Sequence, residues 1–308
     1  MLGRLIKMLM LIGQSTETIC FSYSRKIFCL TAFGLIFGAI FMLFHESAIR
    51  LVVFIGVLIV MIIAEIAWPK RSLLPIKKRR WFSNLSLVIL SSVTLRLLLP
   101  AGAVGVAIWG NFHHFGLFYW IQLPNWLAII LSIIVLDLAI YLQHFVFHKN
   151  ALLWRLHQVH HADPDIDVTT GLRFHPLEIL ISLGFKLIVI LLLGIPVVAV
   201  LLFEIILNAM AMFNHSNVRL PSQVDHLIRQ LLVTSDMHRV HHSIEYTEMN
   251  SNYGFNLSCW DRLFKTYIDQ PDLGHIEMKI GLSHFKDIKK ASQLKMMLVM
   301  PFLKRTKR

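Results

Sequence analysis

Long apolar segments separated by short polar ones dominate the first two thirds of the chain. Six of them approach the roughly 20 residues that a helix needs to cross the hydrocarbon core of a bilayer. They are residues 27–44, 51–68, 85–109, 126–147, 177–193 and 197–213. The last two are short and separated only by Gly194, Ile195 and Pro196, so a re-entrant hairpin fits as well as two full spans. The pattern predicts an all-α integral membrane protein with four to six transmembrane or re-entrant helices.

Composition supports the same class of protein. Of the 308 residues, 56% are hydrophobic and 16% are charged, and the mean hydropathy is +0.63. A soluble domain has about 45–50% apolar and about 25% charged residues, so a soluble enzyme is not expected. The net charge of +12 would suggest nucleic-acid binding in a soluble protein, but here it is explained by basic loops beside membrane helices. The three cysteines show no CxxC spacing and predict neither a disulfide framework nor a zinc ribbon.

Lysine and arginine mark one side of the predicted helices. Two basic groups precede the first segment and separate the second from the third: Arg4, Lys7, Arg25, Lys26, Lys70, Arg71, Lys77, Lys78, Arg79 and Arg80. Residues 110–125 contain neither lysine nor arginine, whereas residues 274–308 carry nine against two acidic residues. Because such cations accumulate in cytoplasmic loops, we expect the basic groups on the cytoplasmic side. The compact chain favours a bacterial inner membrane, and the endoplasmic reticulum is the alternative.

Histidine is concentrated in one part of the chain. Eleven of the 16 histidines fall between His144 and His242. Eight of them form three clusters, HFVFH, LHQVHH and MHRVHH, which contain His144, His148, His157, His160, His161, His238, His241 and His242. Residues spaced by three or four positions share one face of a helix, so each cluster can direct its rings to one point. Pro164 is expected to end the second helix, and Thr234 to Asp236 offer N-caps for the third.

A metal site explains these clusters better than structural histidines do. Unpaired imidazoles beside a bilayer each cost on the order of kcal/mol, whereas neutral imidazole nitrogens are good metal ligands. One tetrahedral ion takes four ligands, so eight histidines imply two ions. His175, in the segment RFHP, and His215, in the segment NHSN, lie at the same predicted membrane face and are expected as further ligands or near-ligands.

These motifs resemble those of the fatty acid hydroxylase/sterol desaturase superfamily of integral membrane oxidases. The matching segments are the three clusters, RFHPLE around His175 and NHSN around His215, followed by Asn252-Tyr253-Gly254 and residues 260–264. The resemblance covers about residues 127–267. Ala211 stands where some relatives have a further histidine, which leaves the number of ligands at that corner open.

The resemblance implies a non-haem di-iron centre at the cytoplasmic membrane face. It would activate O2 and attack a C–H bond of a lipid, by hydroxylation or desaturation, with the ten histidines named above as ligands. Three regions follow: membrane-anchoring helices in 1–125, a catalytic domain with a cytoplasmic helical cap in 126–270, and a basic tail in 271–308. The sequence contains no recognisable haem or flavin domain, so a separate reductase, ferredoxin or cytochrome b5-like donor is expected.

Spacing also suggests residues that support the ligands. A ligating histidine commonly donates its second N–H to a carboxylate or amide. The candidates, by helical spacing or by nearness to the third cluster, are Asp137, Glu204, Asn208, Asp236, Asn252 and Asp261. Asp163, Asp165 and Asp167 follow the second cluster, where a solvated acidic loop and a patch that docks the electron donor are equally compatible with the sequence.

Imidazole spacing alone does not select iron, because Zn, Cu and Ni bind the same ligands. The argument for a redox metal is location, since the predicted site opens toward helices rich in Leu, Ile, Val and Phe rather than toward water. The alternatives are a polytopic metal-ion transporter and a non-catalytic metal-binding membrane protein. A transporter requires polar residues along a path across the bilayer, and here the ligands gather at one face.

Overall fold

A computed structural model describes residues 46–285 and 287–303 of the chain. The predicted helix 27–44 and the basic residues that precede it lie outside the described residues. Within these the fold is all-helical and contains no β-strand, only isolated bridges. Five stretches are long and apolar enough to cross a membrane: Glu46–Ala67, Lys77–Trp120, Asn125–Lys149, Pro176–Leu193 and Val197–Asn214. The predicted all-α membrane class is confirmed.

The third predicted segment differs most from the structure. Helix α3 (Lys77–Leu98) begins eight residues earlier than residue 85, and the chain turns near Pro100 before α4 (Gly102–Phe112). The basic residues at its start were expected in a loop, but they form its first turn, and Arg80 is fully buried. A short helix, α5 (Leu117–Trp120), then leads to α6 (Asn125–Lys149).

Helices α4, α6, α8 (Pro176–Leu193) and α9 (Val197–Asn214) pack around one apolar core. The residues 177–193 and 197–213 thus form two separate helices of 18 residues each. Their connection passes very close to the chain before α5, since a Cβ on Gly116 would lie 2.2 Å from the Gly194 nitrogen. Both glycines have positive φ, 113° and 67°, which only glycine adopts at little cost.

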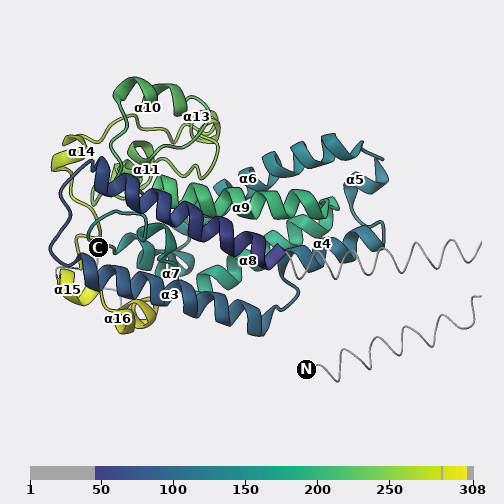
Figure 1. The fold of residues 1–308 in the computed structure, drawn as a ribbon, viewed down its shortest axis with the longest axis horizontal. Helices are drawn as coiled ribbons and strands as arrows, with labels where there is room; N and C mark the ends of the chain where they lie inside the picture. Colours follow the sequence, from purple (N-terminus) through teal and green to yellow (C-terminus); the bar gives the residue numbers. More distant parts are fainter. Residues whose placement is uncertain (1–45, 286, 304–308) are drawn as a thin grey trace, which may run out of the picture. The chain divides into compact units, whose positions relative to one another are not determined.

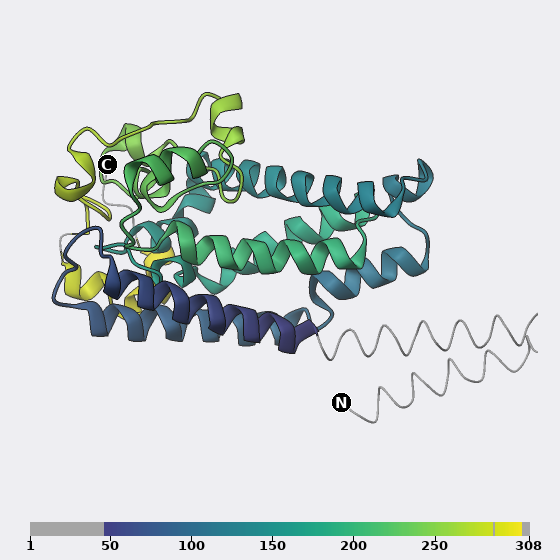
Figure 2. The ribbon, with the colours of Figure 1, turned by 45° about the horizontal axis from the view of Figure 1, so that its top comes forward.

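Smaller elements gather at the opposite end of this bundle from α5 (Figures 1 and 2). They are α7 (Ala151–His161), η2 (Thr170–Leu172), α10 (Ser222–Ile228), α11 (Ser235–His241), α12 (Tyr246–Met249), α13 (Cys259–Leu263), α14 (Gly274–Glu277), α15 (Ile288–Ala291), α16 (Leu294–Val299) and η3 (Met300–Phe302). We call these elements and their connections the cap.

The region expected as a basic tail contributes to the cap. Met297 and Met300 are buried in an apolar cluster with Trp154 and Val159 of α7. Arg173 donates to the Ala291 carbonyl oxygen at 2.7 Å. Residues after 271 therefore help to hold α7 in place. The predicted boundaries at 125/126 and 270/271 stay predictions.

Candidate metal centre

Helix ends deliver the first two histidine clusters to one place. His144 and His148 lie in the last two turns of α6. Asn150 then caps α7, because its side chain accepts the N–H groups of Leu152 and Leu153. Helix α7 ends at His161, as the nearby proline predicts, so the second cluster occupies its last two turns.

The third cluster follows the same logic. The Thr234 side chain accepts the Met237 N–H and starts α11, which ends at His241. His215 directly follows the last residue of α9. The η2 turn packs tightly against this position, since a Cβ on Gly171 would lie 2.5 Å from the Ala211 oxygen and 3.2 Å from the His215 Nδ1. A side chain at Gly171 would therefore clash with the Ala211 carbonyl, which accepts the His215 Nδ1–H.

Nine of the ten predicted histidines form two buried groups. In each group, one ring nitrogen of every member lies within 4.8 Å of the corresponding nitrogen of every other member. The five-histidine group consists of His144, His148, His157, His161 and His241. The four-histidine group consists of His160, His215, His238 and His242. Each group takes residues from at least three helix ends, so neither is a product of one local motif.

The spacing of the ring nitrogens fits ligands of a common ion. The Nε2 atoms of His144 and His157 are 3.1 Å apart, and His215 Nε2 is 3.0 Å from the Nε2 atoms of both His160 and His238. Two nitrogens that bind one ion at about 2.1 Å and at a right angle lie about 3.0 Å apart. The two groups therefore already have the compactness that metal binding requires.

Hydrogen bonds at the other ring nitrogen orient four of these histidines. The Nδ1–H groups of His144, His215 and His241 donate to backbone carbonyl oxygens, namely those of Tyr253, Ala211 and Ser251, at 2.8, 2.6 and 2.7 Å. His157 donates its Nδ1–H to the Glu178 carboxylate at 2.6 Å. An Nδ1 that carries the proton leaves the Nε2 lone pair available for a metal.

Several buried ring nitrogens have no hydrogen-bond partner. They are His148 Nε2, His160 Nδ1, His161 Nδ1 and Nε2, His238 Nδ1, His241 Nε2, and His242 Nδ1 and Nε2. Buried polar atoms are nearly always satisfied, because each one left unpaired costs about 1–3 kcal/mol. A ring can direct one nitrogen at an ion, so metal ions would account for four of these atoms: His148 Nε2, His241 Nε2 and one nitrogen each of His161 and His242. The donor set consists of nitrogen alone, which suits Fe, Zn, Cu or Ni and not Mg or Ca.

The surroundings keep these rings neutral. Burial lowers the pKa of His157 to about 3 and that of His215 to about 4. The pKa values of the other ligand candidates on α7 and α11 also lie well below the ordinary value, first because of burial and then because neighbouring imidazoles disfavour a second charge: His160, His161, His238, His241 and His242. Rings that stay unprotonated at neutral pH are ready to bind a metal.

His175 lies outside both groups. Its Nδ1 accepts the Leu177 N–H and caps α8, and its Nε2 is 3.3 Å from the Leu298 carbonyl oxygen. The structure thus gives it a role as an N-cap that connects α8 to the C-terminal part of the cap.

The residues predicted to support the ligands act at a distance from them. Asp137 accepts the N–H groups of residues 256 and 257 and the Trp260 indole N–H. Asp261 accepts the N–H groups of Tyr253 and Gly254 and so fixes this segment of backbone. The Tyr253 carbonyl oxygen in the same segment orients His144. Burial raises the pKa of Asp261 to about 6.

Two further predicted residues, Asn252 and Asp236, bind other groups of the cap and of the chain before α3. Asn252 holds the segment after α12 through the Met237 and Ile268 backbone groups. Asp236 is paired with Lys70 and Arg239.

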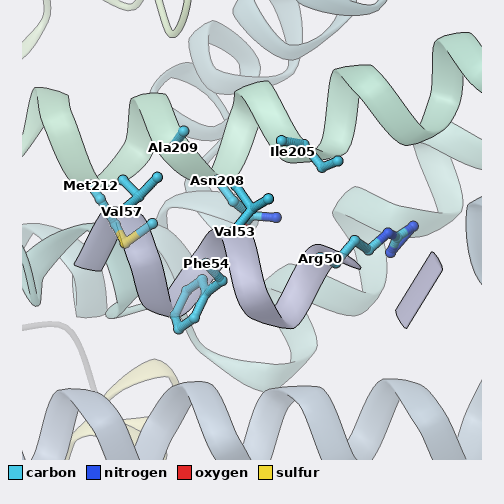
Figure 3. A pocket seen from close by; sticks show the side chains of 8 residues that line it. All are labelled: Arg50, Val53, Phe54, Val57, Ile205, Asn208, Ala209 and Met212. Carbon is cyan, nitrogen blue, oxygen red and sulfur yellow. The ribbon is translucent and has the colours of Figure 1, made fainter. Parts of the chain in front are cut away.

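Glu204 and Asn208 lie within the membrane helices. Glu204 pairs with Arg50 and Lys186, and Asn208 donates to the Glu204 carbonyl oxygen. Asn208 also lines a small pocket between the helix Glu46–Ala67 and α9, whose other lining residues are Arg50, Val53, Phe54, Val57, Ile205, Ala209 and Met212 (Figure 3). None of the predicted ligands lines this pocket.

Sequence reasoning missed Glu178 as the partner of His157. The signal was present, because Glu178 belongs to the RFHPLE segment and opens α8. Among the described residues, Glu178 has the only carboxylate that accepts a hydrogen bond from a histidine of either group. The predicted candidates were selected by spacing along one helix or by nearness in sequence, whereas Glu178 reaches His157 from a different helix.

The three aspartates after the second cluster are neither solvated nor available for docking. Asp163 and Asp167 are fully buried, and Asp165 nearly so. Arg80 donates to both oxygens of Asp163, at 2.6 and 3.0 Å, and to Asp167 at 2.8 Å. Both sequence-based interpretations of this segment were wrong. The aspartates are buried because Arg80, which is 83 residues from Asp163 in the chain, is buried with them and offsets their charge.

Arg80 and the three aspartates, together with Trp81 and Asn84, form what we call the Arg80–aspartate network. Asn84 donates to Asp163, and Trp81 donates to Asp167, both at 3.1 Å. Burial alone would raise the pKa of Asp163, but the guanidinium groups of Arg80 and Arg173 outweigh it and lower that pKa. The network fixes the loop that immediately follows His160 and His161.

Membrane-length helices with two buried groups of histidines at one end define a class, the integral membrane proteins with a candidate polyhistidine metal site. Comparison with known families narrows it, because residues 129–266 match the fatty acid hydroxylase family. This match supports the resemblance to the fatty acid hydroxylase/sterol desaturase superfamily that the histidine motifs indicated.

Individual relatives are more distant. The chain is 28% identical to an ornithine lipid hydroxylase of Rhizobium tropici over 150 residues, 49% of this chain and 44% of the relative. It is also 28% identical to human alkylglycerol monooxygenase over 182 residues, 58% of this chain and 37% of the relative. A fatty acid hydroxylase of Lecanicillium matches at 28% over 172 residues, 51% of this chain and 46% of the relative. The chain thus spans less than half of these curated relatives, and no solved structure matches it significantly.

Proposed function

We propose that this protein is a membrane-bound oxidoreductase that uses two iron ions and O2 to hydroxylate or desaturate a C–H bond of a lipid. The observation that carries the proposal is the pair of buried histidine groups with unpaired ring nitrogens inside a fatty acid hydroxylase domain. The five-histidine group would hold one ion and the four-histidine group the other. Iron is favoured over zinc because the related hydroxylases and monooxygenases are oxidoreductases by name.

The chain itself would hold, orient and shield the reacting centre. Two bound iron ions would supply the activation of O2 and the oxidation of the C–H bond; in a hydroxylation one oxygen atom enters the substrate and the other leaves as water, with two electrons and two protons consumed. The anchored Nδ1–H groups of His144, His157, His215 and His241 keep the ligand nitrogens aimed inward. Burial of every ligand candidate excludes water that would otherwise quench the oxidant.

The substrate class follows from the location of the histidine groups at the ends of apolar helices. A lipid can reach them from the bilayer without crossing water, and the relatives' names specify an ornithine lipid, an alkylglycerol and a fatty acid, all of which carry an alkyl chain. We therefore propose a lipid C–H bond as the target and a separate electron donor as the partner. From the basic residues, we propose that the histidine end lies at the cytoplasmic face of the membrane. The bacterial source of the ornithine lipid hydroxylase favours a bacterial inner membrane.

The test compares lipids from cells with and without the gene, grown under 18O2. We expect one lipid that gains a single 18O atom, or loses two hydrogens, only when the gene is present. The variant His160→Ala should abolish this product, and the variant His226→Ala, which changes an exposed histidine of α10, should keep it. A product that persists in His160→Ala would contradict the proposal.

A metal transporter is the alternative class. It would give metal-dependent ion flux across vesicles that contain the protein, without consumption of O2 and without any modified lipid. That combination would replace the proposed oxidation with transport.

A further inference from the structure

The cap carries a group of exposed apolar side chains on α13 and on the end of α10. Leu227 and Leu231 are 68% and 62% exposed, and Leu263 and Phe264 are 65% and 46% exposed. These two segments are joined, because Ser258 N–H donates to the Leu231 carbonyl oxygen at 3.0 Å. Arg262 of α13 donates to the Arg229 carbonyl oxygen at 2.7 Å, which ties α13 to the end of α10. We call the segments 224–231 and 259–265 the apolar edge of the cap.

The apolar edge lies against the middle of a membrane helix, not against its end. Trp260 donates to Asp137 at 2.9 Å. Asp137 is twelve residues from each end of α6, which is about 18 Å along the helix axis. Phe264 stacks on Tyr141, one turn further toward the histidines, with ring centroids 5.2 Å apart.

The length of α6 fixes the depth of this contact. Its 25 residues extend about 37 Å, longer than the roughly 30 Å hydrocarbon core. Even if the hydrocarbon core begins at the Asn125 end of α6, it extends over about 20 residues of the helix and includes both Asp137 and Tyr141. The side chains of α13 that pack on these two residues therefore lie at the depth of the hydrocarbon or its boundary.

The Asp137 carboxylate and the groups of the cap that face it are hydrogen-bonded, as a position at that depth requires. Asp137 accepts the backbone N–H groups of Asn256 and Leu257 as well as the indole N–H of Trp260. Irregular backbone is tolerated inside a membrane only when such internal partners exist. In water the same four apolar side chains would be an aggregation hazard, whereas Arg262 and Lys265 beside them are exposed cations that suit anionic headgroups.

We propose that the apolar edge of the cap inserts into the leaflet of the bilayer nearest the histidine groups. The lipid surface is the partner, with Leu227, Leu231, Leu263 and Phe264 in the acyl region and Arg262 and Lys265 at the headgroups. The cap then sits partly within the bilayer, and α13 and α6 together border the lipid from which a substrate would come. This inference concerns membrane contact and does not depend on whether the proposed oxidation occurs.

Spin-label accessibility in liposomes tests the insertion. In a background with Cys20, Cys29 and Cys259 replaced by Ser, single variants Leu227→Cys, Leu231→Cys, Leu263→Cys and Phe264→Cys are labelled with a nitroxide. Collision with O2, which concentrates in hydrocarbon, is compared with collision with a water-soluble nickel chelate. Ile188→Cys on the exposed apolar face of α8 gives the hydrocarbon reference, and Lys289→Cys on exposed α15 gives the aqueous reference.

We expect the labels at 263 and 264 to show an O2-to-nickel ratio several-fold above that of Lys289→Cys and close to that of Ile188→Cys. Labels at 227 and 231 should lie between the two references, on the hydrocarbon side. If all four positions match Lys289→Cys, the edge is in water and the inference is wrong. Lipid-product assays on the same variants are read separately, so a loss of the proposed enzyme activity would leave this result unaffected.

Discussion

Two buried polar clusters meet at the end of α7, and they differ in whether their atoms are satisfied. His161 ends the helix within the five-histidine group, and Asp163 belongs to the Arg80–aspartate network two residues later. Every side-chain donor and acceptor of Arg80, Asp163, Asp165 and Asp167 that is buried has a partner. The histidine groups retain eight unpaired ring nitrogens.

This difference separates a structural cluster from a binding one. The network combines cations and carboxylates of this chain and is complete without anything added, so its role is to fix the loop after α7. The histidines are all of one chemical type, and where Nδ1–H already donates elsewhere, as in His144 and His157, the facing Nε2 atoms are both acceptors and cannot bond to each other. A buried cluster of identical groups that lacks internal partners needs a ligand from outside, and in the function proposed above metal ions would supply it.

The largest expected effect is the response of the metal-free protein to acid. The folded pKa values of His160 and His238 lie well below the unfolded value near 6.5, mainly because of burial. Their contribution to stability is fully present above about pH 6.5 and is lost as the pH falls, since only the unfolded chain then binds the protons. Each such histidine adds about 1.4 kcal/mol per pH unit to the slope of stability against pH.

The contribution of Asp163 to stability is lost at lower pH than that of the histidines. Its folded pKa is lowered, so its contribution is present above its unfolded value of 3.8 and is lost only in stronger acid. Between pH 7 and 5 the melting temperature of protein stripped with a chelator should therefore fall steeply, and His160→Gln with His238→Gln should reduce the slope. A slope that is flat, or unchanged in the double variant, would show that these rings do not titrate on unfolding.

The next largest effect concerns the network. Replacing Arg80 by Met leaves Asp167 buried without a cation and Asp163 with only Arg173, 3.6 Å away. Breaking a buried ion pair in this way costs about 3–5 kcal/mol. The melting temperature in detergent should drop by many degrees. Arg79→Met is the matched control, because Arg79 is adjacent and exposed and should have almost no effect. Equal losses in the two variants would mean that the network adds no stability.

A smaller effect is expected from Glu178, which contacts the histidine groups from outside. Glu178→Gln keeps an oxygen that can accept the His157 N–H but removes the charge that strengthens this ligand. Loss of such a partner typically lowers metal affinity about 10–100-fold. Competition with a chelator measures this, with Glu277→Gln, an exposed glutamate of α14, as the control. Unchanged affinity in Glu178→Gln would remove Glu178 from the account of metal binding.

The sequence predicted those features that depend on spacing within one helix. Local periodicity predicted the histidine clusters at 144–161 and 238–242. Proline and capping signals predicted the end of α7 at His161 and the N-cap of α11 at Thr234. Features that depend on meetings between distant segments were not accessible in this way. Arg80 joins Asp163, Glu178 joins His157 and Asp137 holds Trp260, and in each case the partner lies on another element. His175 shows that a motif can be present without its histidine joining the group. It belongs to the predicted RFHPLE segment, but its ring serves as the N-cap of α8.

The most direct test of the central claim is the metal content of the protein purified from cells, measured together with X-ray absorption at the metal edge. Two groups of histidines predict two irons per chain with nitrogen as the dominant ligand, and His160→Ala should lower the count while His226→Ala leaves it at two. A wild-type protein with one ion or none, or with a ligand shell dominated by oxygen or sulfur, would contradict a dimetal centre built from these histidines.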